Sequence, residues 1–347
     1  MSHISLSICI PTYNFGKFIG ETIESIIKQI EDDVEIVILD GASTDNTAEI
    51  VRSYQRRNLR LFYFCLEKRG GIDCDLAKAV ELAHGEYCWL LSSDDIITKN
   101  AIIDIKNKLL LNYDVLLFSR INCNIYLEPR KIQYALRSKI KEGIYNFSHD
   151  EELINYCRNA VDLSALFSYM STIIVKKSKW DSIPLEYSSI GTAYSHVYRI
   201  LSILREGGLL FYSSQPIVFL RMGNDSFETD NKIERYFLDL DGYKKLAEYF
   251  FNTNEQLKYY FWGVLRKTHS WRSLYKAKIV AKSKNDWGVM QIKLKKLYFN
   301  RTKLFVIRNT SLLFKLLFAI RNSYVVNINN LSIKENISNL KFSLRKK

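Results

Sequence analysis

Long uncharged segments are missing from this 347-residue sequence, in which no run of about 18 or more residues is free of Asp, Glu, Lys and Arg. A membrane-spanning helix needs about 20 predominantly apolar residues, so none is predicted. A secretory signal is missing too, because the start is short and polar and the apolar run after it ends at Pro11. We therefore expect the protein to stay on the cytoplasmic side of the membrane.

The glycine-rich signatures of nucleotide-binding loops are also absent. No GxGxxG follows the first apolar run, and GxxxxGK[ST] occurs nowhere in the chain. Without those glycines the backbone cannot bring its N–H groups around a pyrophosphate, which excludes a dinucleotide site of that type and a P-loop. A metal ion held by carboxylates would have to do that work if a diphosphate binds.

Paired cysteine spacings are the third absence. None of the cysteines stands in a CxxC pair, and no histidine lies near them in a zinc-like pattern. Several lie inside apolar runs, where a free thiol packs as a small hydrophobe. The sequence therefore predicts reduced thiols. The six are Cys9, Cys65, Cys74, Cys88, Cys123 and Cys157.

Acidic residues are scarce in the last part of the chain. From Glu255 to the end there are 21 Lys and Arg against 3 Asp and Glu, whereas residues 1–254 carry 29 against 34. The net charge is therefore +18 in the last part and −5 in the remainder, which together make the +13 of the whole chain. This asymmetry indicates an anionic partner, either a membrane surface or a nucleic acid.

Residues 4–95 alternate between β-rich apolar runs and helical patterns. The apolar runs are Ile4–Ile10, Glu35–Leu39, Leu59–Leu66 and Tyr87–Leu91, and the helical patterns between them are Phe18–Gln29, Asn46–Arg57 and Cys74–Ala83. Continuous rather than alternating apolar runs are typical of strands buried on both faces. The sequence therefore predicts an α/β fold with a Rossmann-like, mostly parallel sheet flanked by helices.

Polar side chains follow three of these strands. Thr12 comes after the first strand, Asp40 after the second, and Asp94 and Asp95 after the fourth. The carboxyl ends of parallel strands meet at one edge, where open α/β sheets bind ligands, and adjacent carboxylates suit a divalent cation that holds phosphate oxygens. The alternative is a helix N-cap with an acidic first turn, because the sequence from Ile96 onward looks helical. Because three strand ends carry polar residues, we favour the ligand site over the helix N-cap.

Three segments carry motifs that are specific as a set. They are Ile10-Pro11-Thr12-Tyr13-Asn14, the run LDGASTDNT at 39–47, and Gly85-Glu86-Tyr87 leading to Ser93-Asp94-Asp95. This set resembles the family 2 glycosyltransferases of the GT-A fold, over residues 1–230. A narrower similarity is to bacterial O-antigen enzymes of the abequosyltransferase kind, which use a CDP-linked deoxysugar. It is carried by Trp89 and by the segment from Gly71-Ile72-Asp73 to Lys78.

The resemblance implies a nucleotide-sugar donor and assigns residues to it. Pro11, Thr12 and Tyr13 would line the pocket for the base and ribose, and Asp40 would hydrogen-bond the base. A carboxylate accepts equally well from the N3–H of uracil and from the amine of cytosine. Lys78 would lie near the base or the diphosphate.

The resemblance also implies a Mg²⁺ or Mn²⁺ ion on the donor diphosphate. Asp95 would ligate this ion, and Asp94 would contact the ribose or a metal-bound water. The ion would stabilise the departing nucleoside diphosphate as a Lewis acid. Arg221, which follows a strand predicted at Pro216–Leu220, would pair with the diphosphate. The alternative for Arg221 is a surface arginine at the end of a strand.

One position departs from the family pattern, which often has an Asn near position 77, where this chain has Ala77. Asp73 and Asp75 stand close by. We interpret them as the N-cap and acidic first turn of a helix rather than as donor contacts.

The acceptor side depends on a helix predicted to open at residues 191–196 and to run to Arg205, with Gly207 and Gly208 as its stop. Family 2 enzymes often carry a Glu-Asp pair here, whose Asp is the general base on the acceptor hydroxyl. Counted back from Gly207, His196 falls on that Asp, and an imidazole can accept a proton near neutral pH. The alternative is a histidine with a structural role. The family is generally inverting.

Helical patterns rich in aromatic residues replace strand patterns after Asp230. Leu304–Ile320 is mainly apolar but is interrupted by Arg308 and Lys315, which is typical of an interfacial amphipathic helix. Basic residues before it would be attracted to anionic lipid. The alternatives are a basic helical subdomain packed on the catalytic domain, and nucleic-acid binding, which no recognised motif supports. We expect a catalytic domain at 1–230 and a helical, basic, membrane-associating region at 231–347.

Together these features predict a metal-dependent glycosyltransferase that is peripheral at the inner face of the cell membrane. It would move a sugar, such as abequose from a CDP-linked donor, to a polyprenyl-diphosphate-linked oligosaccharide in O-antigen or other surface polysaccharide synthesis. One alternative is a polyprenyl-phosphate glycosyltransferase. Another is a nucleotide-binding assembly protein without catalysis, which the missing Glu-Asp pair keeps open. No nucleic-acid partner is expected.

Overall fold

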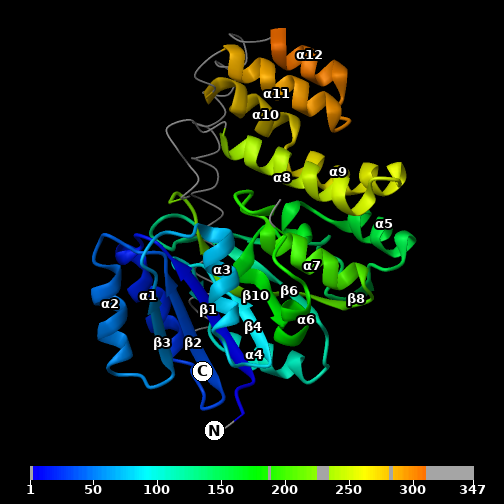
Figure 1. The fold of residues 1–347 in the computed structure, drawn as a ribbon. Helices are drawn as coiled ribbons and strands as arrows, with labels where there is room; N and C mark the ends of the chain where they lie inside the picture. Colours follow the sequence, from blue (N-terminus) through cyan, green and yellow to red (C-terminus); the bar gives the residue numbers. More distant parts are fainter. Residues whose placement is uncertain (1–2, 187–188, 225–233, 281–283, 310–347) are drawn as a thin grey trace, which may run out of the picture.

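Residues 3–90 of the computed structural model fold as the alternating pattern predicts (Figure 1). The structure describes residues 3–186, 189–224, 234–280 and 284–309. All residues of the first, second and fourth strands are buried, which explains why their sequences are unbroken apolar runs. The elements are β1 (Leu6–Thr12), α1 (Gly16–Ile27), β2 (Val34–Asp40), α2 (Thr47–Gln55), β3 (Leu61–Cys65), α3 (Ile72–Glu81) and β4 (Tyr87–Leu90).

The next part of the chain adds six strands to the same sheet. The elements up to residue 221 are β5 (Ile96–Ile97), α4 (Ala101–Leu109), β6 (Val115–Cys123), β7 (Pro129–Gln133), β8 (Glu142–Asn146), α5 (Asp150–Asn159), the short 3-10 helices η1 (Leu163–Leu166) and η2 (Met170–Thr172), β9 (Ile173–Lys176), α6 (Lys177–Ser182), α7 (Ser195–Arg205) and β10 (Leu209–Arg221). The helix predicted to end at Arg205 is thus confirmed.

The strand order of the sheet is β3-β2-β1-β4-β9-β6-β10-β5, with β7 paired to β6 and β8 to β10. The strands β3, β2, β1 and β4 are parallel, as predicted for residues 4–95. Beyond β4 the sheet is mixed, because β9 lies antiparallel between β4 and β6. The parallel half puts the ends of β1, β2 and β4 at one edge, and this edge carries the polar residues.

Helices cover both faces of the sheet (Figure 1). Ile8 and Ile10 of β1 pack in one hydrophobic cluster with Ile23 of α1, and Cys9 packs in a second cluster with Ala79 of α3. Successive side chains of a strand point to opposite faces, so β1 contributes to both clusters. The α/β class with flanking helices is therefore confirmed.

The chain after β4 differs from the expectation of a helix from Ile96 onward. Asp94 lies in a turn, β5 follows, and α4 begins only at Ala101. The strand β5 forms because it pairs with β10, a partner far along the chain that local sequence patterns do not reveal. The interpretation of Asp94 and Asp95 as a helix cap is therefore wrong.

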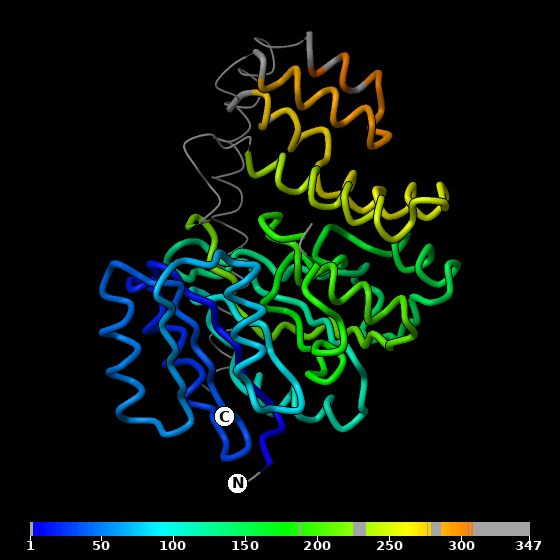
Figure 2. Tube along the Cα trace, in the orientation of Figure 1, coloured from blue at the N-terminus to red at the C-terminus, as the bar shows by residue number. Residues whose placement is uncertain are grey.

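The described residues after 233, which are 234–280 and 284–309, are helical, as predicted. The trace in Figure 2 shows its first two helices lying across the α5 and α7 side of the sheet domain, with the others stacked beyond them. Side chains of α5, α7 and these helices share one hydrophobic cluster. The expected boundary at residue 230 lies outside the described residues. The helices are α8 (Glu234–Phe251), α9 (Glu255–Thr268), α10 (Trp271–Val280), α11 (Lys284–Lys296) and α12 (Arg301–Asn309).

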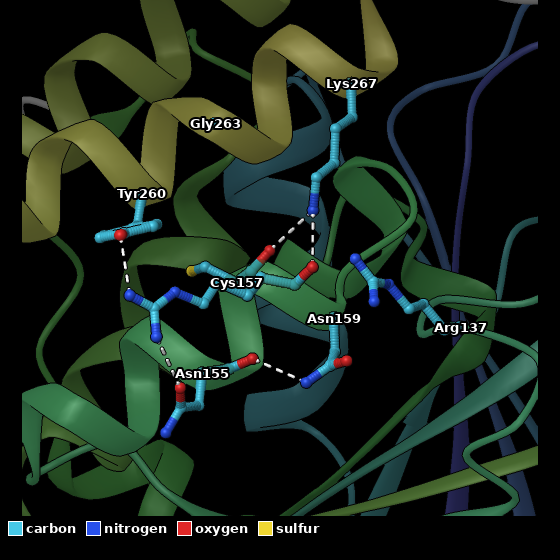
Figure 3. Close-up of a pocket in the computed structure, with 8 residues that line it drawn as sticks. Arg137, Asn155, Cys157, Asn159, Tyr260, Gly263 and Lys267 are labelled. Atoms are coloured by element: carbon cyan, nitrogen blue, oxygen red, sulfur yellow. Dashed lines mark hydrogen bonds between the residues drawn. The ribbon is translucent and has the colours of Figure 1, made fainter.

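Polar contacts fasten α9 to the end of α5 (Figure 3). The ammonium group of Lys267 donates hydrogen bonds of 2.8–3.0 Å to the carbonyl oxygens of Cys157, Arg158 and Ala160. The guanidinium of Arg158 donates to the hydroxyl of Tyr260 at 2.8 Å. A cation at the carboxyl end of a helix satisfies carbonyl groups that have no partner within the helix and complements the helix dipole. The helical region is therefore docked on the sheet domain by specific bonds.

None of the helices in the described ranges is both long and apolar enough to cross a bilayer. The interfacial helix predicted at Leu304–Ile320 is only partly described: α12 ends at Asn309, and residues 310–320 lie outside the described residues.

Candidate active site

A cavity of about 320 Å³ lies at the carboxyl end of β4. This is the edge at which open α/β sheets bind ligands. Its lining comes from several separate elements, so the fold gathers side chains that are far apart in sequence. The acidic, basic and histidine side chains in the lining are Asp94 and Asp95 after β4, Asp73 in the first turn of α3, His196 in α7, Arg221 at the end of β10 and Arg235 in the first turn of α8.

Asp95 is almost fully buried, with 3% of its surface exposed. One carboxylate oxygen accepts a hydrogen bond from the Ser171 hydroxyl at 2.5 Å, and the other accepts from the Arg221 N–H at 3.0 Å. Burial and the neighbouring charge of Asp94 raise the pKa of Asp95 to about 8. A carboxyl group with such a pKa gains most from a cation placed against it.

Asp94 is held by the turn that follows β4. Its carboxylate accepts hydrogen bonds from the Ser92 hydroxyl and from the Asn224 side-chain amide. Burial raises its pKa as well, although these hydrogen bonds oppose the change. The two adjacent carboxylates are therefore fixed in place by partners from β10, η2 and their own turn.

The donor set fits a hard divalent cation that also binds substrate. The described residues contain no group of three or more His, Cys, Asp and Glu side chains that could hold a metal ion. The Asp94–Asp95 pair offers carboxylate oxygens, which Mg²⁺ and Mn²⁺ prefer, and Mg²⁺ commonly takes one or two carboxylates plus substrate phosphates. An ion here would draw its remaining ligands from a bound diphosphate or from water.

Arg221 is buried, with 3% of its side chain exposed, so it is not the surface arginine of the alternative interpretation. Its guanidinium donates to the carbonyl oxygens of Asp94 and Ile125 at 3.0 and 2.7 Å, and to the Glu21 carboxylate at 2.5 Å. Three of its five N–H groups therefore bond to protein, which leaves two for a ligand. Its observed contacts hold the Asp94 turn against β10.

His196 lies in the first turn of α7 and is 6% exposed. Its Nε2 lies 2.9 Å from the carbonyl oxygen of Phe167. A carbonyl only accepts, so this contact assigns the proton to Nε2 and leaves Nδ1 unprotonated in the neutral ring. Burial lowers the pKa of His196 below its ordinary value, so the neutral imidazole prevails at pH 7. That is the form a general base requires.

Asp73 organises the chain that leads into α7. It lies in the first turn of α3 behind the N-cap residue Gly71, so the acidic first turn is confirmed but the N-cap is not an Asp. Its carboxylate accepts hydrogen bonds from the N–H groups of Gly191, Ala193 and Ser195 at 2.8, 3.0 and 3.1 Å. Bonds to three N–H groups fix the segment just before His196.

The residues expected at the nucleotide lie beside this cavity rather than in its lining. Thr12 and Asp40 are direct neighbours in the β1–β2 register, and both are buried. Asp40 accepts hydrogen bonds from the Ser43 N–H and the Tyr63 hydroxyl, each at 2.7 Å. The Thr12 hydroxyl has no partner among the described residues. A buried hydroxyl without a partner is a candidate for a ligand contact.

Further residues belong to this neighbourhood. Pro11 is buried in β1, and Tyr13 is half-buried with the Arg69 guanidinium 4.1 Å above its ring. Asp75 lies so close to the backbone that a Cβ at Gly41 would come within 2.6 Å of its carboxylate. Burial raises the pKa of Asp75 to about 6.

Lys78 is not brought to the cavity. Its ammonium group pairs with Glu81 at 2.5 Å, and it lines a separate hollow with Trp180 and Arg199. Helical spacing explains this placement, because α3 turns Asp73 toward the cavity and Lys78, more than one turn on, toward α6 and α7. The expected place of Lys78 near the base or diphosphate is therefore not supported by the geometry.

Sequence reasoning also misses Asn224 and Arg235. Asn224 stands three residues beyond the predicted site residue Arg221, which is a weak signal. Arg235 lies in an ordinary helical pattern that contains nothing to mark it. Only the docking of α8 brings it to the cavity.

Comparisons with known proteins give consistent results. The family model described as "Glycosyl transferase family 2" matches residues 7–171, a range that includes Asp94 and Asp95. Abequosyltransferase RfbV of Salmonella typhimurium is 35% identical over 272 residues, which cover 77% of this chain and 81% of the relative. Glycosyltransferase GlyG of Streptococcus pneumoniae is 35% identical over 97 residues, or 28% of this chain and 32% of the relative.

Solved structures of similar shape include residues 1–349 of TarS from S. aureus. In complex with UDP-GlcNAc it gives a TM-score of 0.57 at 17% identity, covering 88% of this chain and 89% of TarS 1–349. A second structure of TarS 1–349 gives a TM-score of 0.55 at 18% identity, with the same coverage of both chains. At such low identity the likeness concerns the fold.

Proposed function

From the premise that this chain belongs to glycosyl transferase family 2 and is a glycosyltransferase, we propose that its donor is a nucleotide sugar and its acceptor a lipid-linked glycan of a surface polysaccharide such as O-antigen. The GT-A fold expected from the sequence is confirmed. The observation that carries the proposal is the cavity in which the Asp94–Asp95 pair faces the same space as the buried, neutral His196.

The proposed donor is a CDP-linked deoxysugar such as CDP-abequose. Its support is the identity of 35% to an abequosyltransferase over most of both chains. The proposed acceptor is a polyprenyl-diphosphate-linked oligosaccharide, in keeping with O-antigen assembly. Asp40 and the unpartnered hydroxyl of Thr12 would meet the base and ribose, since they lie at the sheet edge beside the cavity.

We propose a reaction in which the residues around the cavity take the following roles. Nδ1 of His196 takes the proton of the acceptor hydroxyl as its oxygen attacks the anomeric carbon of the donor. The bond from that carbon to the diphosphate oxygen breaks, and the nucleoside diphosphate leaves. A single displacement of this kind inverts the anomeric centre. Asp73 would keep His196 in place through the N–H groups of Gly191, Ala193 and Ser195, the last of which begins α7.

We also propose a Mg²⁺ or Mn²⁺ ion, for which Asp95 is the ligand and Asp94 its neighbour. When bound, such an ion supplies Lewis-acid stabilisation of the charge on the departing diphosphate. Ser171 and the Arg221 N–H hold the Asp95 carboxylate in a fixed orientation for this role.

A thermal-shift panel of CDP, UDP, GDP and dTDP with Mn²⁺ tests the donor. A ligand at 100 times its Kd stabilises the folded state by about 2.7 kcal/mol, so the nucleotide that binds best should raise the melting temperature most. We expect that nucleotide to be CDP. If UDP, GDP or dTDP gives the largest rise in melting temperature, the donor is a sugar linked to that nucleotide and not a CDP-sugar. If none of the four raises the melting temperature, the nucleotide-sugar proposal is contradicted.

We further propose that the helical region binds the anionic inner face of the membrane. Tyr259, Trp271 and Tyr298 are half exposed and line one hollow together with Arg266. Aromatic and basic side chains on one surface are typical of proteins at the lipid headgroup level. Each basic residue near an anionic bilayer contributes about 1 kcal/mol of attraction.

Co-sedimentation with phosphatidylglycerol vesicles tests this surface. The triple change Tyr259→Ser, Trp271→Ser and Tyr298→Ser should reduce the bound fraction at least tenfold, because about 1.4 kcal/mol of interfacial burial corresponds to that factor. Leu59→Ser is the matched control, since Leu59 is 94% exposed in the sheet domain. Equal sedimentation of the triple variant and the wild type would refute the role of this surface.

A further inference from the structure

The helical region contributes a cation to the cavity at the sheet edge. Arg235 lies in the first turn of α8, and its side chain lines the cavity together with Asp94, Asp95 and His196. The side chain is 29% exposed, so solvent and ligands can reach it. The cavity therefore needs α8 for its complete lining.

A buried carboxylate holds this arginine in place. Asp239, one helical turn further along α8, accepts hydrogen bonds from the Arg235 guanidinium and from the Tyr194 hydroxyl. The Arg235 guanidinium also donates to the Tyr194 hydroxyl at 3.1 Å, and the ring nitrogen Nε2 of His269 lies 3.1 Å from Asp239. Burial alone would raise the pKa of Asp239, but His269 and Arg235 lower it, so the group is ionised at neutral pH.

The same contacts connect α8 to the segment that carries His196. Tyr194 immediately precedes α7, and its ring packs on Tyr243 of α8 with centroids 4.8 Å apart. A Cβ at Gly242 would come within 2.4 Å of the Tyr194 ring, so the glycine allows α8 to lie close against it. The position of Arg235 is therefore set by the sheet domain as well as by its own helix.

The charges around the cavity indicate what Arg235 binds. Asp73, Asp94 and Asp95 bring three acidic side chains, and among the described lining residues the guanidinium groups are those of Arg221 and Arg235. Arg221 already uses three N–H groups on protein acceptors. The negatively charged diphosphate of a nucleotide, placed beside these acidic side chains, needs positive charge from the protein in addition to any metal ion.

We infer that Arg235 binds the diphosphate of the nucleotide donor and product, and that Asp239 is a positioning residue that aims it. This inference rests on the proposed function, because it presumes a nucleoside diphosphate in the cavity. It makes the helical region part of the donor site in addition to its proposed place at the membrane.

Calorimetry on the full chain tests the assignment. Arg235→Gln should weaken binding of CDP with Mn²⁺ by about 10- to 100-fold, since hydrogen bonds to a charged group are lost. Binding of free cytidine should stay unchanged, because it lacks the diphosphate. Arg235→Lys should recover part of the loss. Lys244→Gln is the matched control: it removes a cation from the same helix, where Lys244 pairs with Glu248 on the surface.

The outcomes separate this inference from the proposed function. If wild-type protein binds none of the four nucleoside diphosphates, the nucleotide-sugar function fails and this inference with it. If the wild type and Arg235→Gln bind CDP equally well, the inference alone is overturned. If CDP binding is unchanged while KM for a diphosphate-linked acceptor rises, Arg235 binds the acceptor phosphate, which also overturns it.

A double-mutant cycle tests the positioning role of Asp239. Asp239→Asn should weaken CDP binding in the wild-type background. In the Arg235→Gln background it should raise the dissociation constant of CDP by less than about twofold. Equal effects in both backgrounds would show that Asp239 acts through the general stability of α8. Cytidine binding and the melting temperature of each variant report whether the fold is intact.

Discussion

Replacing Asp95 by Asn should lower the rate of sugar transfer by about three orders of magnitude while the fold stays intact. The reason is that a metal ion on the diphosphate supplies several kcal/mol of stabilisation to the departing group, and each 1.36 kcal/mol is a factor of ten in rate. Asp95 is the buried carboxylate at the end of β4 to which we assign this ion. Steady-state kinetics with Mn²⁺ and the donor measure the effect.

The fold should tolerate this substitution because Asp95 already holds a proton in the metal-free protein. Its pKa of about 8 lies above the value of an unfolded chain, so ionisation lowers the free energy of unfolding as pH rises from about 4 toward 8. An Asn side chain can still accept from the Arg221 N–H and can donate to the Ser171 hydroxyl. Urea unfolding of Asp95→Asn should therefore show stability equal to the wild type only below about pH 4, and a stability above that of the wild type at pH 6 and at pH 9.

The same pKa makes metal binding dependent on pH. The ion must displace the Asp95 proton, so the apparent affinity for Mn²⁺ should rise about tenfold per pH unit between pH 6 and 8 and level off above pH 8. The matched control is Asp181→Asn, in which an exposed carboxylate that pairs with Lys177 is removed. Transfer at the wild-type rate by Asp95→Asn would refute the metal assignment.

Replacing His196 by Gln should lower transfer by about 10²- to 10⁴-fold, the usual contribution of a general base. Gln keeps a donor for the Phe167 carbonyl but cannot take a proton at neutral pH. Binding of CDP should be unchanged by calorimetry, because His196 acts on the acceptor hydroxyl. Rate and affinity measured on the same preparation separate the two effects.

The pH profile gives a second test of His196. Burial lowers its pKa, so at saturating donor, acceptor and Mn²⁺ the rate should fall only below the pH range in which an ordinary imidazole becomes protonated. The control is His149→Gln, because His149 is exposed and outside the cavity lining. Wild-type turnover by His196→Gln would assign the base to another residue.

Part of the site follows from local sequence rules. The unbroken apolar runs place β1, β2 and β4 in one parallel sheet, and the polar residues after β4 then lie at its carboxyl edge. The glycines after Arg205 end α7 and so place His196 near its start. These inferences succeed because strand burial, helix ends and parallel crossovers depend on short stretches of chain.

Other parts depend on partners far away in sequence. The segment after Asp95 forms β5 because β10 is beside it, although its own pattern looks helical. Lys78 points away from the cavity because the packing of α3 decides which of its faces meets the sheet edge. Arg221 is buried by contacts with Asp94, Ile125 and Glu21, none of which its own sequence context indicates.

The sequence by itself determined the α/β fold, the glycosyltransferase family and the positions of Asp94 and Asp95 at one edge of the sheet. Strand and helix periodicity and the motifs that end each strand are local, so they can be read along the chain. Only the tertiary structure decided that His196 and Arg235 face the same cavity as the Asp pair. That arrangement is set by how α7 and α8 pack through Tyr194, Asp239 and Gly242, and such packing depends on complementary shapes that no single segment encodes.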